Sequence, residues 1–371
     1  MKRLTLSCLA VFLTSLVNAQ IVANSNLFSV SDGTEISTTA DITNNGTIDL
    51  GQSILYLRGS GQAITNNSMT PLTFFDLIID AGDKTFDGEF DVTNRVDLLG
   101  GIVNISSGRL ILRASASQQP IGVEASYFTG EFYNEGTGLK TFPIGTSDRF
   151  TPITLTNVNG TDPIIGLKAF NVGLALEGTT VPDRIENVSS SWHWELIALS
   201  DGGNFESSPI ELPLNDEDAS LINGDNLVYT IVQVDANFAS VKNIGGQLNG
   251  NNVRSTAPAT DQFFALAAVK NVKPQINNVI TPFQDNANDY LRIQNITFFP
   301  DNEVILLDRW GTEVFRRANY QHPDDPSEPF EEDFSFLAPG NYMCIFRYID
   351  GDTGVESIEK QTITVIKKGQ P

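Results

Sequence analysis

Phe74-Phe-Asp-Leu-Ile-Ile79 is the first of several short apolar runs that recur at intervals of about ten residues. It is followed by Phe86 to Val92, Val96-Asp-Leu-Leu99, Ile102-Val-Asn-Ile105 and Arg109-Leu-Ile-Leu112. Ala-Gly, Thr-Asn, Gly-Gly and Ser-Gly turns separate the runs, and helical periodicity is almost absent from the chain. Short β-branched and aromatic runs between turn residues indicate strands, so the sequence predicts an all-β protein.

Each of these runs has too little apolar surface to form a core by itself. Stacked as coils of a parallel β-helix, neighbouring runs would share one core, and we expect such a repeat region over residues 20–116. The stretch Gly59-Ser-Gly-Gln-Ala-Ile64, followed by the run from Phe74 to Ile79, also resembles the rungs of Bacteroidetes surface proteins. An antiparallel sandwich with similar alternation is the alternative.

The segment 117–272 has longer predicted strands and more acidic loops, which favours a β-sandwich domain. It contains Ser191-Trp192-His193-Trp194-Glu195, where alternation places both Trp rings on one face and His193 on the other. Trp192 and Trp194 could stack on sugars, or they could fill the sandwich core, since aromatic side chains bury large apolar areas. The stretch Val269-Lys-Asn-Val-Lys-Pro274 then reads as a linker.

The last hundred or so residues carry Val304-Ile-Leu-Leu-Asp-Arg309-Trp310-Gly311-Thr-Glu-Val-Phe315, then Pro339-Gly340-Asn-Tyr342 and a strand through Ile363-Thr-Val365. This region, residues 273–371, resembles the C-terminal sorting domain of type IX secretion substrates, in the type B form associated with gliding motility in Bacteroidetes. The resemblance implies a small Ig-like β-sandwich. It also implies export through the type IX translocon, with a PorP/SprF-like outer-membrane β-barrel protein as the recognising partner.

The resemblance places partner recognition on Arg309, Trp310 and Gly311, and on Asp285, Asn288 and Asp289 of the opening loop. We expect Gly311 to allow a tight turn, with the Trp310 indole packed beneath it. The opening loop, Thr281-Pro-Phe-Gln-Asp-Asn-Ala-Asn-Asp289, keeps Thr281, Pro282, Asp285, Asn288 and Asp289 of the family loop but lacks its two glycines. The family's Trp-Asp-Gly turn is also replaced, by an acidic stretch from His322 to Asp333.

The same loop is a candidate calcium site. Asp285, Asn286, Asn288 and Asp289 place four oxygen-bearing side chains within five residues, and Ca²⁺ prefers clustered carboxylate and amide oxygens. Such clusters also build turns without an ion. No other cofactor is expected.

The N-terminus predicts export. Lys2 and Arg3 precede an apolar run from Leu4 to Val17, and small residues end at Ala19, which is typical of a signal peptide over residues 1–19. Leu6-Ser7-Cys8 resembles the end of a lipobox, although the apolar stretch before it is very short. Removal of the leader would leave Cys344 as the last of the two cysteines, so stability must come from packing rather than disulfides.

The composition of the chain disfavours several classes of partner and site. Asp and Glu total 45 against 23 Lys and Arg, a net charge of −22, which disfavours nucleic acid and anionic lipid as partners. No other apolar stretch is long enough to span a bilayer, so we expect no integral membrane protein. The two histidines, His193 and His322, lack the surroundings of a triad, a metal motif or a phosphate loop, and no catalytic residue is assigned.

These patterns predict a protein that is exported to the cell surface or the medium. We expect the Sec pathway to carry it to the periplasm and the type IX system to carry it across the outer membrane. We expect a structural or adhesion role, linked to gliding motility, and no enzymatic activity. The alternatives are a carbohydrate-binding surface module, suggested by Trp192 and Trp194, and a secreted polysaccharide-active enzyme whose two acids need carry no local signature.

Overall fold

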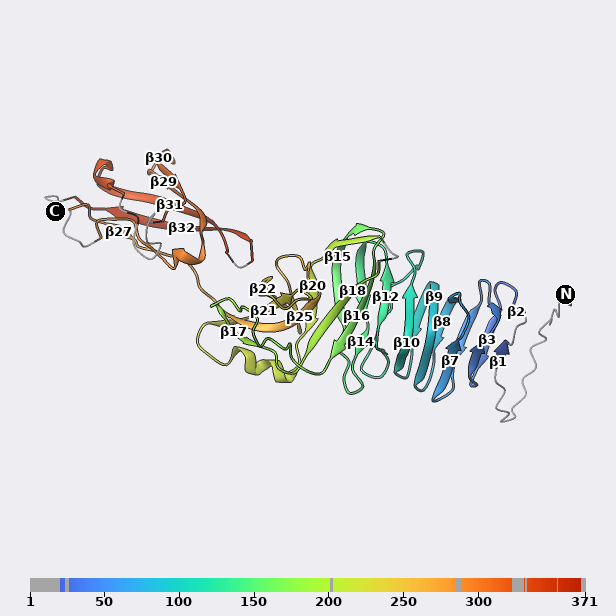
Figure 1. The fold of residues 1–371 in the computed structure, drawn as a ribbon. Helices are drawn as coiled ribbons and strands as arrows, with labels where there is room; N and C mark the ends of the chain where they lie inside the picture. The colour runs from blue at the N-terminus through green and yellow to red at the C-terminus, as the bar shows by residue number, and fades with distance from the viewer. Residues whose placement is uncertain are drawn as a thin grey trace.

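The computed structural model describes residues 21–23, 27–200, 203–283, 288–321, 330, 332–351 and 353–367. Figure 1 shows an elongated chain, with a coiled stack of strands at the N-terminal end, a sheet region in the middle and a small β domain at the C-terminal end. The predicted signal peptide lies outside the described residues. Within the described ranges, no helix is long and apolar enough to cross a membrane.

The predicted all-β class is confirmed, and so is the β-helix. The N-terminal strands are β1 (Ile21–Ala23), β2 (Leu27–Ser29), β3 (Glu35–Thr38), β4 (Ile42–Asn44), β5 (Thr47–Asp49), β6 (Ile54–Leu57), β7 (Gln62–Asn66), β8 (Leu72–Ile79), β9 (Lys84–Leu98), β10 (Val103–Leu112), β11 (Phe128–Thr129), β12 (Phe132–Glu135) and β14 (Ile144–Gly145).

Parallel pairing between successive coils makes this region a solenoid. One ladder runs through β1, β4, β7, β9, β10, β11 and β14, a second through β3, β6, β8 and β9, and a third through β8, β9, β10 and β12. Asn44 pairs with Asn66 in the next coil, 22 residues along the chain. The recurrence of apolar runs in the sequence therefore reflects the successive sides of each coil.

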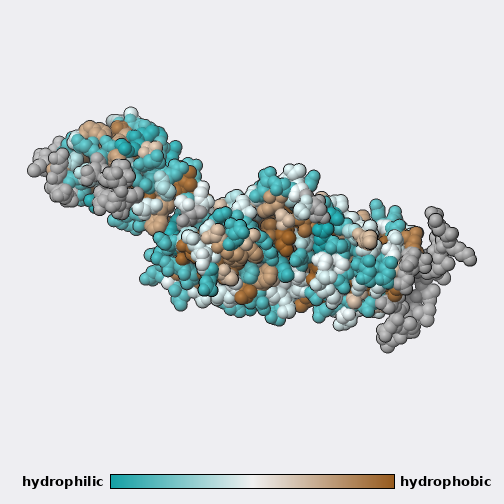
Figure 2. Space-filling view, viewed as in Figure 1, coloured by the Kyte–Doolittle hydropathy of each residue, from teal (hydrophilic) through white to brown (hydrophobic). Residues whose placement is uncertain are grey.

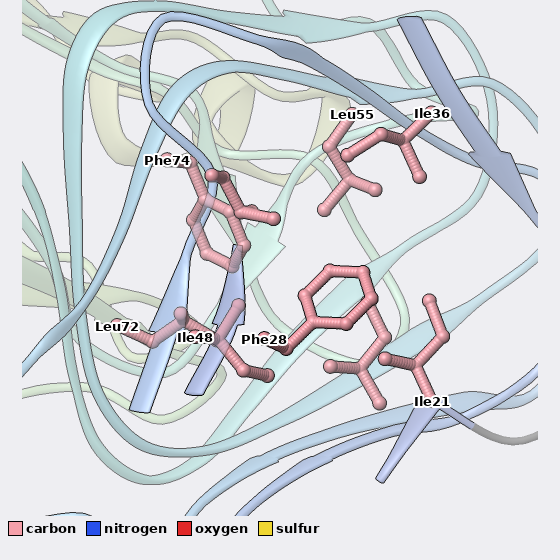
Figure 3. A pocket seen from close by; sticks show the side chains of 9 residues that line it. Ile21, Phe28, Ile36, Ile48, Leu55, Leu72 and Phe74 are labelled. Carbon is pink, nitrogen blue, oxygen red and sulfur yellow. The ribbon is translucent and has the colours of Figure 1, made fainter. Parts of the chain in front are cut away.

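The solenoid core consists of the inward side chains of these ladders. Figure 3 shows the first coils, where Ile21, Phe28, Ile36, Ile48, Leu55, Leu72 and Phe74 point toward one another inside the coil. Farther along, Phe74, Phe86 and Phe90 form an aromatic group with ring centroids 5.0–6.5 Å apart. All three Phe side chains are buried, as a shared core between coils requires.

One corner of the coil is occupied by Asn44, Asn66, Gly88 and Gly108 in four successive coils. The Asn44 amide donates to Asn66 Oδ1 at 2.8 Å, and the Asn66 amide donates to the Glu89 carbonyl of the next coil at 2.8 Å. At Gly108, with φ +72°, a Cβ atom would lie 2.1 Å from the Gly88 carbonyl oxygen. In the first coils the corner is therefore held by hydrogen bonds between Asn side chains and their neighbours. In the later coils glycine lets the two backbones approach each other directly.

The solenoid continues into the middle region without a break in the core. β12 pairs antiparallel with β16 (Ile164–Phe170), which leads into a sheet with β17 (Ile185–Val188), β18 (His193–Ala198), β21 (Leu227–Val234), β22 (Val241–Asn243) and β25 (Phe263–Lys270). A second sheet contains β13 (Gly138–Phe142), β15 (Ile153–Thr161), β19 (Asn204–Ser207), β20 (Ile210–Pro213), β23 (Gln247–Asn249) and β24 (Asn252–Arg254). The helical segment η1 (Asp216–Ile222) lies between β20 and β21.

The two middle sheets share one buried cluster, which includes Phe142, Leu155, Trp194, Ile210 and Phe264 and also extends to the solenoid. Parallel pairing reaches β11 and β14, beyond residue 116, so solenoid and middle region form one continuous hydrophobic core.

The C-terminal domain has a core of its own. Its strands are β26 (Gln275–Ile276), β27 (Val279–Ile280), β28 (Ile293–Gln294), β29 (Asp301–Leu307), β30 (Glu313–Ala318), β31 (Gly340–Ile349) and β32 (Glu356–Val365), with the short helices η2 (Ile296–Phe298) and η3 (Phe334–Phe336). The main sheet has the order β27-β32-β31-β29-β30, and a separate β26-β28 pair accompanies it. Phe299, Tyr320, Phe334 and Phe346 are buried in a cluster whose described members all lie between Ile276 and Val365.

Candidate functional site

The connection between β29 and β30 is a tight turn organised by Asp308. Its Oδ1 atom accepts hydrogen bonds from the backbone N–H groups of Trp310, at 2.8 Å, and Thr312, at 2.9 Å. Its backbone carbonyl accepts from the Gly311 N–H at 3.0 Å. Gly311 has φ +80°, a left-handed conformation that glycine adopts without strain. The segment from Asp308 to Thr312 therefore forms an ordered turn, as we expected from the glycine at position 311.

The Trp310 indole projects from this turn into solvent. The residue is 83 % exposed, which is the opposite of the packing beneath the turn that the sequence suggested. Arg309 beside it is exposed as well. The expectation was wrong because the aromatic residue follows the last core position of β29, Leu306, by four residues, and the turn carries it past the end of the sheet.

Within the described part of the opening loop, the Asp289 side chain and the Asn288 backbone carbonyl both accept hydrogen bonds from backbone N–H groups of the same loop. The Asp289 carboxylate is buried and accepts from the Phe283 N–H at 3.0 Å. Asn288 is exposed with φ +55°, and its carbonyl accepts from the Thr281 N–H at 2.7 Å. Asp285 and Asn286 lie outside the described residues. Across the ranges that are described, no three His, Cys, Asp or Glu residues form a metal-binding group, and calcium at this loop stays a prediction.

Trp192 and Trp194 are both part of the protein interior. Trp194 is fully buried and donates its indole N–H to the Thr151 carbonyl at 3.1 Å. Trp192 is 8 % exposed, and the Arg149 guanidinium lies 4.7 Å from its ring centroid. Neither ring presents a face on which a sugar could stack, so the core interpretation accounts for both residues.

His193 faces away from the two Trp rings, as alternation predicted. Its ring stacks on Phe170 with centroids 4.5 Å apart, and its Nδ1 lies 2.6 Å from the Val172 carbonyl. Burial lowers the pKa of His193 despite this hydrogen bond, which favours the neutral ring at pH 7. Among the residues that the structure describes, no hydroxyl or thiol group forms a hydrogen bond with this imidazole. Its ring contacts are with Phe170 and Phe263, as expected for a residue packed between aromatic side chains.

Cys344 lies on the inner face of β31 in the core of the C-terminal domain, as its alternating strand predicted. Burial raises the pKa of its thiol to about 12. The thiolate is the reactive form of cysteine, so the native protein holds this side chain in an unreactive state at neutral pH.

We therefore expect Cys344 to resist alkylation by iodoacetamide at pH 8 in the native protein and to react fully in urea. The label reports opening of the C-terminal domain, because Cys344 lies in the cluster of described residues that forms that domain's core. Mass spectrometry of a peptide containing Cys344 measures the result. Rapid labelling without denaturant would show that the thiol is accessible in the folded domain.

One interaction that sequence reasoning missed joins the C-terminal domain to the middle region. Arg184 Nη1 donates to Asp350 Oδ2 at 2.8 Å, although the two residues lie 166 positions apart in the chain. No local motif marks either residue. Neither would be selected without the tertiary structure.

The comparisons identify the C-terminal domain. Residues 274–365 match the family model described as CHU_C Type IX secretion signal domain. No curated protein and no solved structure matches the chain. The match covers the described strands β26 to β32 and ends at Val365, the last residue of β32. The C-terminal domain of this chain therefore belongs to the type IX secretion signal family, in the type B form that the sequence predicted.

Proposed function

We propose that this chain is a non-enzymatic structural or adhesion component of the bacterial cell surface, delivered by the type IX secretion system and linked to gliding motility. The observation that carries the proposal is the type IX secretion signal domain over residues 274–365, which implies export to the cell surface or the extracellular space. The outer-membrane partner would be a PorP/SprF-like β-barrel protein.

The Asp308–Thr312 turn is the best candidate for the contact with that partner. Exposed aromatic residues, Trp above all, and Arg are enriched among the residues that dominate binding energy at protein interfaces. Arg309 and Trp310 occupy adjacent positions on a turn that three hydrogen bonds to Asp308 already order. An ordered turn loses little conformational entropy when it binds, so the exposed indole is a pre-organised anchor.

The shape of the cargo supports a structural role. The solenoid and middle region share one core, which makes them a stiff and extended body between the N-terminus and the sorting domain (Figure 1). Figure 2 shows hydrophilic residues over much of the visible solenoid surface. The burial of Trp192 and Trp194 removes the feature that suggested sugar binding. An extended spacer that carries its export signal at one end is suited to display at a surface.

The test is export of a fluorescent protein placed between a signal peptide and residues 274–371. We expect the reporter outside the cell only when the translocon is intact, and we expect Trp310→Ala to lower its export several-fold without changing the melting temperature. Phe336→Ala is the matched control, because Phe336 is another exposed aromatic residue of the same domain, at 57 % exposure. It should be exported like the parent. Periplasmic retention of the parent fusion in cells that contain the cognate outer-membrane partner would refute the proposal.

A further inference from the structure

A largely buried ion pair connects the middle region with the sorting domain. The Arg184 side chain, just before β17, is 9 % exposed, and that of Asp350, in the turn between β31 and β32, is 18 % exposed. Their charged atoms are 2.8 Å apart. The exposed solenoid pair Arg58–Asp80 has exposures of 46 % and 31 %. The interdomain pair is thus much better shielded from water than an ordinary surface ion pair.

Several elements meet around Arg184. Its guanidinium carbon lies 5.5 Å from the centroid of the Phe298 ring in η2, within the range of a cation–π contact. The Phe298 carbonyl accepts from the Gly351 N–H at 3.1 Å, which ties η2 to the turn that carries Asp350. The Asn295 amide also donates to the Lys273 carbonyl of the linker at 2.9 Å. Arg184 therefore contacts a part of the sorting domain in which η2 and the turn that carries Asp350 are connected by a hydrogen bond.

The burial of this pair makes it sensitive to the loss of either partner. An exposed ion pair contributes little, because water and salt screen it and two long side chains must be ordered. Removal of one partner from a buried pair takes a close counter-charge from the other group in a poorly solvated place. Neutralising Asp350 should thus weaken the docking of the sorting domain far more than neutralising Asp80 would weaken the solenoid.

The strand register shows how far the end of the sheet that contacts Arg184 lies from Trp310. At one end of the sheet Asp301 pairs with Ile349, next to Asp350; at the other end Leu307 pairs with Met343, next to the turn that carries Trp310. The intervening strand β29 spans seven residues, or about 20 Å at the rise of an extended strand. Docking through Asp350 therefore leaves the Trp310 turn at the opposite end of the sheet from the middle region.

We propose that Arg184 is a positioning residue for the sorting signal: through Asp350 and Phe298 it fixes the sorting domain on the cargo so that the Trp310 turn points away from the cargo. The inference rests on the proposed function in one respect, that the Trp310 turn contacts the export partner. Strand β25 ends at Lys270, so without the pair the segment from Asn271 to Pro274 becomes a hinge, and the extended cargo can swing across the face that the partner must reach.

The first measurement requires no export. Lys270, which is followed by Asn271, is a trypsin site at the start of the linker, and docking should protect it. We expect Asp350→Asn and Arg184→Gln to accelerate cleavage there in the full mature chain, whereas Asp350→Glu, which keeps the charge, should restore much of the protection. Arg58→Gln is the matched control and should cleave at the parental rate. Equal cleavage rates in Asp350→Asn and the parent would overturn the proposal.

The second measurement compares two contexts for one substitution. In the full chain, Asp350→Asn should lower export several-fold. In the reporter fusion with residues 274–371, which lacks Arg184, the same substitution should leave export unchanged. An equal loss in both would place the role of Asp350 inside the sorting domain and overturn the positioning role. Failure of the proposed function would look different, because Trp310→Ala would then be exported normally while the linker of Asp350→Asn still cleaved faster.

Discussion

Phe346→Ala is expected to lower the free energy of unfolding of the sorting domain by about 3–5 kcal/mol, the usual loss when a large buried aromatic residue is truncated. Phe346 is fully buried on β31, and its ring lies 5.2 Å from that of Tyr348. The cluster around it is the domain's own core, so the cargo cannot compensate for the cavity. For a domain of this size, the loss consumes a large part of a typical stability of about 5–15 kcal/mol.

The exposed Trp310 provides the contrast. Trp310→Ala removes a larger ring than Phe346→Ala, yet we expect a change within about 0.5 kcal/mol, because substitutions at exposed positions without special structure cost little. Urea denaturation of residues 274–371, followed by circular dichroism and by alkylation of Cys344, measures both variants. A loss of similar size in both would mean that the Trp310 indole packs against the domain, and its role as a free anchor would fail.

The two variants also separate two ways of losing export. Phe346→Ala should reduce export because the folded signal is less populated, and lowering the temperature should restore part of it. Trp310→Ala should reduce export of a fully folded domain, and temperature should have little effect. The distinction matters because a defect in export alone does not show which residues contact the partner.

The solenoid was predictable from sequence for a physical reason. In a parallel β-helix each coil repeats the same inward pattern, so local runs such as Phe74 to Ile79 and Arg109 to Leu112 reveal the ladders to which they belong. Alternation likewise separated Trp194 from His193 correctly, because side chains on a strand point to opposite faces. Both predictions depend on rules that hold within a few residues.

The features that sequence did not reveal depend on distant parts of the chain. The position of Trp310 is set by where the sheet ends, and the sequence of the turn shows only that a turn exists. The Arg184–Asp350 pair links residues 166 positions apart, and neither residue differs locally from many other charged residues of this acidic chain. The sorting domain was recognised through its motifs, but its attachment to the cargo required the tertiary structure.

Gly108→Ala is expected to be among the most damaging single substitutions in the solenoid, with a loss of roughly 2–6 kcal/mol from left-handed strain and overpacking together. Gly108 has φ +72°, which side chains rarely adopt, and its added Cβ would lie 2.1 Å from the Gly88 carbonyl oxygen of the neighbouring coil. That oxygen belongs to the backbone of a central ladder, so it cannot move without disturbing the pairing of β9 with β10.

Gly61→Ala is the matched control that separates the two contributions. Gly61 has a similar φ of +68°, but nothing lies within 4 Å of the position that its Cβ would occupy. Both substitutions carry the backbone strain, and only Gly108→Ala adds the clash between coils. We expect the urea midpoint of the mature chain to fall clearly further for Gly108→Ala than for Gly61→Ala. Equal losses would show that the coils can separate at this corner without penalty, and the close backbone stacking at Gly88 and Gly108 would then not limit the stability of the solenoid.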